Sequence, residues 1–271
     1  DYNYYFQLER SWMPIFGNRV NIQSSLDEIT ISPSFFAPFV NVDADKKHRD
    51  PDYNIFNYPI ESLSEDKNNY VPFKINNELI KKLLIDTLPT TVILGLPEEL
   101  GKGTLIQGPL VTPILKKMMF KSDNFLAEQL LINAQRVQGY ETQKTYLNYL
   151  KSSLFASLPD LMIWVDGSGL SVYNMNTPRN LVKALEIIFH MITWDEIIEL
   201  FPNKFADGNN DNSFVYAKTG TLRHNQALSG YLITQSGRKL AFSFMSNHYT
   251  VPPSQIRAEI EKILLHIRDA Y

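Results

Sequence analysis

The sequence predicts an α+β protein in which helices pack on an antiparallel sheet, with a small β-rich portion on the N-terminal side. Two patterns carry this prediction. Helical periodicity with recognisable caps occupies most of residues 75–200, and extended runs joined by a hairpin occupy residues 214–245. The length of the chain is consistent with this fold class, because 271 residues with 44% hydrophobic content can bury a core in one large or two modest domains.

The first 69 residues are predicted to form a β-rich accessory domain, or the remnant of an inserted one. Residues 20–23 and 28–32 each alternate apolar with polar side chains, as half-buried strands do. Residues 43–69 then become polar and charged, which favours a solvated loop and a domain boundary. The second domain is therefore expected to cover residues 70–271.

Helix starts are marked in the middle of the chain by hydroxyl and amide caps. Asn76 precedes apolar residues at helical spacing, and Thr193 with Glu196 fits a capping box. Thr112 and Thr177 are each followed by a proline, which suits the first turn of a helix. Between these helices, the apolar runs 92–94 and 161–165 are predicted to be short strands.

The C-terminal part is predicted to be a sheet closed by a helix. Residues 214–222 (FVYAKTGTL) favour an extended chain, and residues 228–234 and 239–245 read as the two strands of a hairpin. The strand that carries Lys218 is therefore expected at the sheet edge. Ser254 is predicted to cap the last helix, whose inward positions are Ile260, Ile263, Leu264 and Ile267.

Charge and composition narrow the function classes. The net charge is only −3 with a pI near 6.0, so nothing indicates a nucleic-acid or anionic-membrane partner. No apolar run reaches the ~18 residues of a membrane span. The absence of cysteine is compatible with either redox compartment. No motif predicts a metal site or a cofactor, and because the chain begins at Asp1, any export signal is expected outside it.

Three short motifs bring polar side chains to the ends of predicted elements. Ser122-Asp123-Asn124 lies between two helical runs, Asp166-Gly167-Ser168 follows the apolar run 161–165, and Lys218-Thr219-Gly220 ends a strand. Each also has an ordinary structural explanation. Ser122-Asp123-Asn124 suits a helix cap, and Asp166-Gly167-Ser168 suits a glycine-rich turn. Lys218-Thr219-Gly220 suits an edge strand with a solvated lysine.

Taken together and in this order, the motifs resemble those of the D-Ala-D-Ala carboxypeptidases of the low-molecular-weight, class C penicillin-binding type. The similarity extends to the flanking residues: 121–131 (KSDNFLAEQLL), 165–174 (VDGSGLSVYN), 216–222 (YAKTGTL) and 228–231 (LSGY). It covers about residues 70–271, whereas the first seventy residues match only loosely. The resemblance implies the penicillin-binding and β-lactamase-like transpeptidase fold, incomplete here, and a periplasmic or cell-surface location.

The resemblance also implies a chemistry and partners. In this family a serine attacks the amide carbonyl between two D-alanines, a lysine one helical turn later takes its proton, and the resulting ester is hydrolysed. The substrate would be a peptidoglycan peptide ending in D-Ala-D-Ala, and β-lactam antibiotics would act as inhibitors. No cofactor is needed.

Roles follow for the residues that match the motifs. Ser122 would relay a proton to the leaving amine, and Asn124 would hold the substrate amide. Lys218 would place a cation near the Ser122 hydroxyl and the terminal carboxylate of the substrate. The hydroxyls of Thr219 and Thr221 would bind that carboxylate, while Gly220 would let the substrate backbone approach. Asp166, Gly167 and Ser168 are expected to be structural residues near the site.

The chain departs from the family pattern in lacking a clear nucleophile motif Ser-x-x-Lys. Ser64 and Lys67 have the spacing but lie in a polar run, and Ser236 and Lys239 straddle a hairpin turn. The segment 201–212 also lacks the family's glycine-rich pattern before the Lys218 strand.

Three interpretations remain open for the missing motif. The chain is part of a serine-type carboxypeptidase or endopeptidase whose nucleophile lies outside it, and it is inactive as given. Alternatively, it is a non-catalytic relative that binds peptidoglycan or a protein partner. A weaker alternative is a class A β-lactamase that uses Ser64.

Overall fold

The computed structural model of the chain describes residues 8–25, 28–45, 47–50, 52–62, 68–95, 107–206 and 213–271. They fall into two compact units, one ending at Pro109 and the other beginning at Leu110. The composition placed the domain boundary after residue 69, but residues 71–83 belong with the N-terminal unit, because Val71, Phe73 and Leu83 lie in its core. Ser64 and Lys67 lie outside the described residues.

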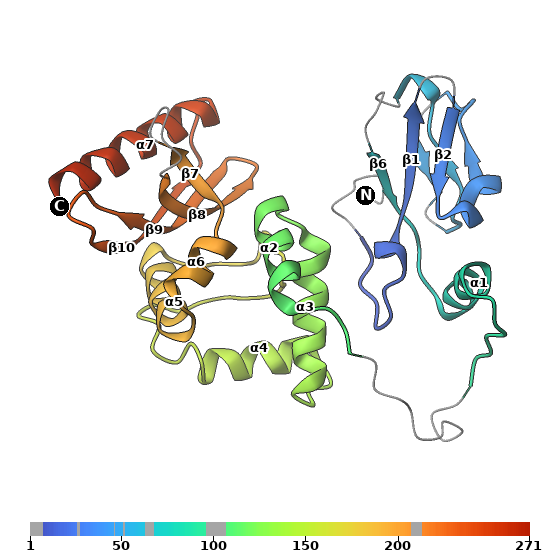
Figure 1. Ribbon diagram of the computed structural model, residues 1–271, viewed down its shortest axis with the longest axis horizontal. Coiled ribbons are helices and arrows are strands. Elements are labelled where there is room, and N and C mark those ends of the chain that lie inside the picture. The colour runs from blue at the N-terminus through green and yellow to red at the C-terminus, as the bar shows by residue number, and fades with distance from the viewer. Residues whose placement is uncertain are drawn as a thin grey trace. The chain divides into compact units, whose positions relative to one another are not determined.

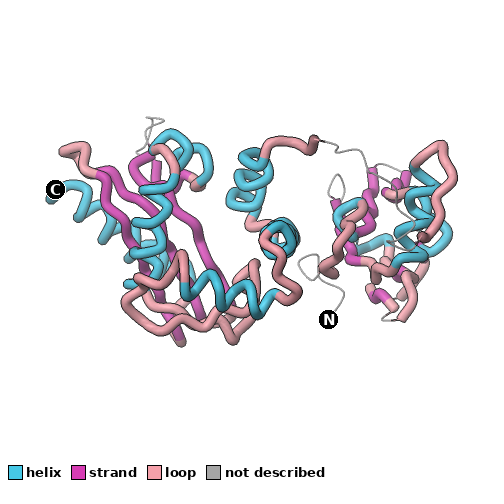
Figure 2. The backbone as a smooth tube through the Cα atoms, turned by 90° about the horizontal axis from the view of Figure 1, so that it is seen from below, coloured by secondary structure: helices cyan, strands magenta, loops and turns pink. Residues whose placement is uncertain are grey.

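The described residues of the N-terminal unit form two small sheets and an α-helix (Figures 1 and 2). In the first sheet, β1 (Arg19–Ser25) pairs antiparallel with β2 (Glu28–Ser32) and β6 (Asn68–Pro72). In the second, β5 (Phe56–Asn57) lies between β3 (Val40–Asn41) and β4 (His48–Arg49). The described part of this unit also includes 3-10 segments at Phe16–Asn18, Ser34–Phe39 and Ile60–Ser62. The strands predicted at 20–23 and 28–32 are found.

One continuous apolar core joins these elements to helix α1 (Asn77–Thr87). The Asn76 side chain caps this helix as predicted, by accepting a hydrogen bond from the Leu79 N–H at 2.8 Å. The prediction of a solvated loop over 43–69 was wrong in part, because Phe56 and Tyr58 are buried in this core. A few apolar residues scattered through a polar stretch leave no periodic signal, so their burial depends on contacts distant in sequence.

The C-terminal unit is a four-stranded antiparallel sheet in the order β10-β9-β8-β7 with helices around it (Figure 1). Its elements are α2 (Val111–Lys121), α3 (Asn124–Val137), α4 (Gln143–Ser152), α5 (Pro178–Met191), α6 (Trp194–Leu200), β7 (Asn203–Ala206), β8 (Ser213–Leu222), β9 (Asn225–Ile233), β10 (Lys239–Asn247) and α7 (Pro253–Ala270). Among the helices that the structure describes, none is both long and apolar enough to cross a membrane.

The two faces of this sheet pack against different helices. On one face, Val215, Leu228 and Leu232 meet Ile260 and Leu264 of α7. On the other, Tyr231 packs with residues of α5 and α6, and its hydroxyl donates to the Leu185 carbonyl at 2.7 Å. Burial raises the pKa of this Tyr231 hydroxyl. The rings of Trp194, Tyr216 and Tyr231 lie together on this second face, with centroids about 6 Å apart (Trp194 to Tyr216 6.0 Å, Trp194 to Tyr231 5.9 Å).

Several local predictions are corrected by the structure. Residues 92–94 form no strand, and 161–165 contributes only one isolated bridge, between Ile163 and Met175. Helix α4 was not predicted. The caps at Thr177 and Thr193 are found, but α2 and α7 begin after Leu110 and Pro252, without a side-chain cap. On α7, Ile263 is 45% exposed instead of inward-facing.

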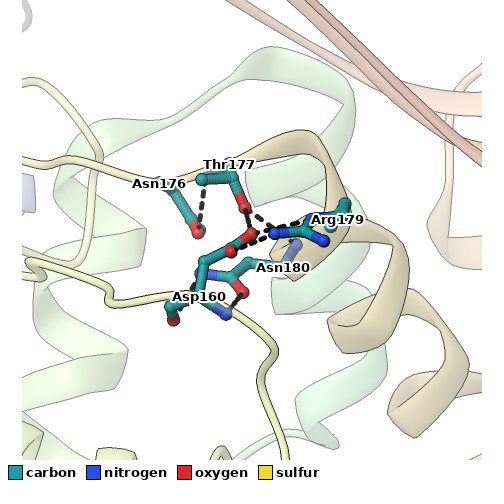
Figure 3. A network of polar contacts seen from close by, with 5 residues as sticks. All are labelled: Asp160, Asn176, Thr177, Arg179 and Asn180. Atoms are coloured by element: carbon teal, nitrogen blue, oxygen red, sulfur yellow. Dashed lines mark hydrogen bonds and ion pairs between the residues drawn. The ribbon is translucent and has the colours of Figure 1, made fainter.

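A polar network fixes the start of α5 to the preceding loop (Figure 3). The Asp160 carboxylate accepts hydrogen bonds from the Thr177 hydroxyl at 2.6 Å and from the Arg179 guanidinium. The backbone of Asp160 pairs with the buried Asn180 amide, whose oxygen accepts at 2.9 Å and whose nitrogen donates at 3.0 Å. The network therefore holds both the carboxylate and the backbone of Asp160.

This network predicts a pH-dependent contribution to stability. The Thr177 hydroxyl, followed by Arg179, lowers the pKa of Asp160 below its ordinary 3.8. A lowered folded-state pKa stabilises the fold above the ordinary value, and the stabilisation is lost as pH falls through the lowered value. We expect Asp160→Asn to lower the thermal midpoint at neutral pH, and we expect this deficit to shrink as pH falls below 3.8. A deficit that stays the same as pH falls would contradict this assignment.

Candidate active site

The side chains of Ser122 and Lys218, 96 residues apart in the sequence, meet in the C-terminal unit. The Lys218 ammonium donates a hydrogen bond to the Ser122 hydroxyl and a second one, of 2.9 Å, to the Thr219 carbonyl. Ser122 comes from the bend between α2 and α3, and Lys218 comes from β8. The structure thus brings the first and third sequence motifs together.

The bend holds Ser122 in an unusual backbone conformation. Ser122 ends α2 with φ 49° and ψ 49°, the left-handed region that disfavours residues other than glycine. Asp123 then caps α3 by accepting a hydrogen bond from the Leu126 N–H at 3.0 Å. The capping explanation of this motif therefore applies to Asp123. Ser122 instead carries backbone strain while its hydroxyl contacts Lys218, and strain of this kind clusters at functional sites.

We expect glycine and alanine at position 122 to separate strain from chemistry. Both Ser122→Gly and Ser122→Ala remove the hydroxyl, but only glycine adopts the left-handed conformation without a Cβ penalty. The Gly variant should therefore be more stable than the Ala variant by about 0.5–1 kcal/mol in urea unfolding. Equal stability of the two variants would show that the bend is not strained.

Lys218 is a half-buried cation in an unusual electrostatic setting. Burial, with a smaller contribution from the like charge of Lys204 on β7, lowers the pKa of its ammonium. Within the described part of the chain, no carboxylate forms an ion pair with Lys218. A partly desolvated cation without a fixed counter-charge attracts an anion from solution. A carboxylate is therefore a ligand that this position favours.

The strand around Lys218 presents a backbone edge on which only the Lys218 ammonium, bonded to the Thr219 carbonyl, is seen among the described residues after Ala217. The Ala217 N–H donates to the Pro202 carbonyl at 2.9 Å, so by strand alternation Thr219 and Thr221 point their backbone groups to the same side of β8. The edge strand of the sheet on this side is β7, which the sequence did not predict. In β8, it pairs only with Ser213, Val215 and Tyr216. Beyond it, no strand in the described ranges covers this side of β8.

The three residues after Lys218 are exposed at this edge. A Cβ added to Gly220 would meet only the Ala227 Cβ, at an ordinary 3.7 Å, so packing within the unit does not require glycine here. The expectation that Gly220 admits a ligand backbone therefore rests on the free edge. Thr219 and Thr221 flank this glycine on the same strand.

The second motif is fastened to α3, the helix that follows Ser122. The Asp166 carboxylate accepts hydrogen bonds from the N–H groups of Gly169 and Ser171, each at 2.7 Å, and from the Asn174 amide at 2.9 Å. A Cβ on Gly167 would lie only 2.7 Å from the Ala127 carbonyl oxygen. Gly167 is therefore needed for the close approach of this loop to α3.

Glu128 is a polar residue of α3 that sequence reasoning missed. It is buried on α3, and its Oε1 accepts a hydrogen bond of 2.9 Å from the Ser168 N–H. Asn124, the first residue of α3, precedes Glu128 by four positions, so the two share one face of the helix. A carboxylate within the apolar helical run 125–137 was the signal that could have identified Glu128.

The second Ser-x-x-Lys pair does not form a nucleophile site. The Ser236 hydroxyl lies in the β9–β10 turn, 3.0 Å from the Thr234 hydroxyl and in contact with the Tyr271 carbonyl. The Lys239 ammonium lies 4.4 Å from the centre of the Trp194 ring. Ser236 and Lys239 are thus engaged by different groups.

Comparisons with known proteins identify the family of the chain. The model of the D-Ala-D-Ala carboxypeptidase 3 (S13) family matches residues 106–266. The D-alanyl-D-alanine carboxypeptidase DacB of Haemophilus influenzae is 28% identical over 194 residues, which cover 65% of this chain and 40% of that protein. Penicillin-sensitive carboxypeptidase A of Dictyostelium discoideum is 25% identical over 185 residues, 60% of this chain and 35% of that protein.

A solved structure shows the same fold. The crystal structure of penicillin binding protein 4 from Haemophilus influenzae, complexed with a novel β-lactam, superposes with a TM-score of 0.60 at 23% identity. The match covers 97% of this chain and 70% of that one. It confirms the predicted α+β fold of the penicillin-binding type. The chain itself spans less than half the length of the two curated relatives.

Proposed function

Because this chain belongs to the D-Ala-D-Ala carboxypeptidase 3 (S13) family, we propose that it forms the substrate-recognition part of a serine-type D-Ala-D-Ala carboxypeptidase. The substrate would be a peptidoglycan stem peptide ending in D-Ala-D-Ala, and the location periplasmic or at the cell surface. The single observation that supports this most strongly is the contact between the Lys218 ammonium and the Ser122 hydroxyl.

In the proposed reaction, Lys218 binds the terminal carboxylate of the substrate, with help from the hydroxyls of Thr219 and Thr221. The lowered pKa of Lys218 eases proton exchange with the neighbouring Ser122 hydroxyl. Ser122 passes a proton to the leaving D-alanine amine. The free edge of β8 pairs with the extended peptide backbone, as strand edges do in other peptide-binding sites.

The supporting residues set the geometry of this site. Asn124 begins α3 and is proposed to hold the substrate amide with its carboxamide. The loop of Asp166, Gly167 and Ser168 is proposed to brace α3 through Glu128, which accepts the Ser168 N–H. No role in bond making is assigned to this loop.

The nucleophile is proposed to come from polypeptide outside these 271 residues. The described residues offer no Ser-x-x-Lys pair suited to attack, since Ser236 and Lys239 are engaged elsewhere. The alternative is a relative that binds the same peptide, or a protein partner, without acyl transfer. A β-lactamase that uses Ser64 is the weaker alternative.

Labelled penicillin combined with a peptide titration tests the proposal. We expect the chain alone to form no covalent penicillin adduct, because it lacks the attacking serine. It should bind a diacyl-Lys-D-Ala-D-Ala peptide weakly and reversibly, and the chemical shift of the Lys218 side chain in NMR spectra should change on binding.

Two other outcomes of these experiments would contradict the proposal. An adduct mapped to Ser64 would establish the β-lactamase alternative and overturn the proposal. The same peptide with its C-terminal carboxylate amidated is the control, because it removes the anion proposed to bind Lys218. Equal affinity for both peptides would contradict the role of Lys218.

A further inference from the structure

The Thr219 carbonyl is a backbone acceptor that the Lys218 side chain occupies. The Lys218 ammonium, from the preceding residue of β8, donates to this carbonyl at 2.9 Å. It also donates to the Ser122 hydroxyl. An ammonium has three N–H donors, so these two contacts leave at most one for a ligand. Lys218 therefore contacts its own strand and the Ser122 bend at the same time.

The Thr219 carbonyl faces the side of β8 on which a peptide strand is proposed to pair. The Ala217 N–H donates to the Pro202 carbonyl at 2.9 Å, so Ala217 points its backbone groups away from β9. Thr219 follows two positions later and points its own N–H and C=O to the same side. The pairing of β7 with β8 reaches only to Tyr216. The Lys218 ammonium therefore lies on the outward side of β8, against an acceptor that a pairing strand needs.

The Lys218 ammonium and a pairing ligand require the same side of the same oxygen. In a paired strand, the N–H of the partner lies about 2.9 Å from the carbonyl oxygen. The Lys218 ammonium already lies 2.9 Å from the Thr219 oxygen. A peptide that pairs along β8 therefore has to displace the ammonium from Thr219 before its own N–H can bond there.

We infer that Lys218 blocks the β8 edge at Thr219, and that the terminal carboxylate of the ligand removes this block. The inference rests on the proposed function, in which Lys218 binds that carboxylate. When the carboxylate binds, the ammonium turns to it and leaves the Thr219 carbonyl. A backbone N–H of the ligand then donates to this carbonyl, so the acceptor is not left unpaired. The Thr219 carbonyl thus becomes a group that binds the ligand.

The strengths of the two contacts favour this exchange. A hydrogen bond between an ammonium and a carboxylate is charged on both sides, whereas the bond to a carbonyl is charged on the donor side only. Lys218 is half-buried, so less water competes for its ammonium. A ligand with a carboxylate therefore offers Lys218 a better partner than Thr219 does. A ligand without one has to compete with Lys218 for the carbonyl, which makes a free carboxylate a condition for pairing.

Replacing Lys218 by methionine tests the block, because the thioether side chain is similarly long but has no N–H to donate. The 271-residue chain is titrated with diacyl-Lys-D-Ala-D-Ala and with the C-terminal methyl ester of this peptide, which lacks the anion. We expect the variant to bind the free acid at least about tenfold more weakly than the parent does, and the methyl ester about three- to tenfold more tightly. Lys144→Met, at an exposed position of α4, is the matched control and should leave both affinities unchanged.

The affinity for the methyl ester decides the inference. Equal or weaker binding of the methyl ester by Lys218→Met overturns the inference, and it leaves the role of Lys218 in binding the carboxylate intact. Equal affinity of the parent for the free acid and the methyl ester, or binding of neither, overturns the proposed function and the inference together.

The carbonyl carbon of Thr219 gives a second readout in the unmodified chain, which does not depend on whether the Met variant folds. A carbonyl carbon shifts upfield in NMR spectra when it loses a hydrogen bond. Analogues of the free acid in which each backbone amide in turn is replaced by an ester keep the carboxylate but lack one N–H. One of these analogues should displace Lys218 without replacing its hydrogen bond, so the Thr219 carbon should shift upfield at saturation. A Thr219 signal that stays unchanged with every analogue overturns the inference.

Discussion

Replacing Lys218 by alanine is expected to slow penicillin acylation by about 10²–10⁴-fold in a protein that joins this chain to a Ser-x-x-Lys segment. Two physical reasons combine. The variant loses the half-buried cation that attracts the carboxylate of the ligand, and it loses the hydrogen bond that positions the Ser122 hydroxyl. The rate of covalent labelling by a fluorescent penicillin measures the effect directly.

A matched control separates this role from a general effect of charge. Lys144 is an exposed lysine on α4, and its replacement by alanine removes the same charge from a different element. We expect the Lys144 variant to acylate at the rate of the parent. An unchanged acylation rate in the Lys218 variant would remove Lys218 from the proposed mechanism.

Replacing Gly230 by alanine is expected to destabilise the C-terminal unit by about 3 kcal/mol or more. Gly230 lies in β9 and is paired with Ala217 of β8, the residue that precedes Lys218. A Cβ at this position would lie 2.2 Å from the Tyr216 carbonyl oxygen and 2.5 Å from the Ala217 Cα. Both are backbone atoms of β8, so the strands must separate where they carry the site. Urea unfolding followed by circular dichroism measures the loss.

Gly220 provides the control for Gly230, because it lies in the neighbouring strand with room for a methyl group. Gly220→Ala should leave the stability within about 0.5 kcal/mol of the parent, since alanine costs less entropy than glycine in a strand. Peptide binding should nevertheless weaken if Gly220 admits the substrate backbone. A Gly230 variant as stable as the Gly220 variant would contradict the close approach of β8 and β9.

Short, local signals allowed much of the fold to be predicted. The Thr193 capping box, the proline after Thr177 and the hairpin turn at 235–238 each depend on neighbours within a few residues. The bend at Ser122 between two helices was predicted for the same reason. The family was also predicted, because its motifs are contiguous, and the match over residues 106–266 confirms it.

Features that depend on distant contacts were missed. The apolar run 161–165 looks like a strand, yet only Ile163 finds a pairing partner, Met175. β7 is only four residues long and pairs with Ser213, Val215 and Tyr216 of β8, so its sequence carries no periodic signal. The link from Glu128 to Ser168 spans 40 residues and could not be derived from spacing alone. The roles of Ser122, Asn124 and Lys218 in catalysis stay predictions.

The aromatic rings beside the site have a practical consequence. Trp194 lies against Tyr216, two residues before Lys218 on β8, and Trp164 donates its indole N–H to the Asp166 carbonyl at 2.7 Å. The chain has only one other tryptophan, Trp12. Two natural fluorophores thus lie on the strand side and the loop side of the site. The intrinsic tryptophan fluorescence of the unlabelled protein is therefore expected to respond to ligand binding on both of these sides.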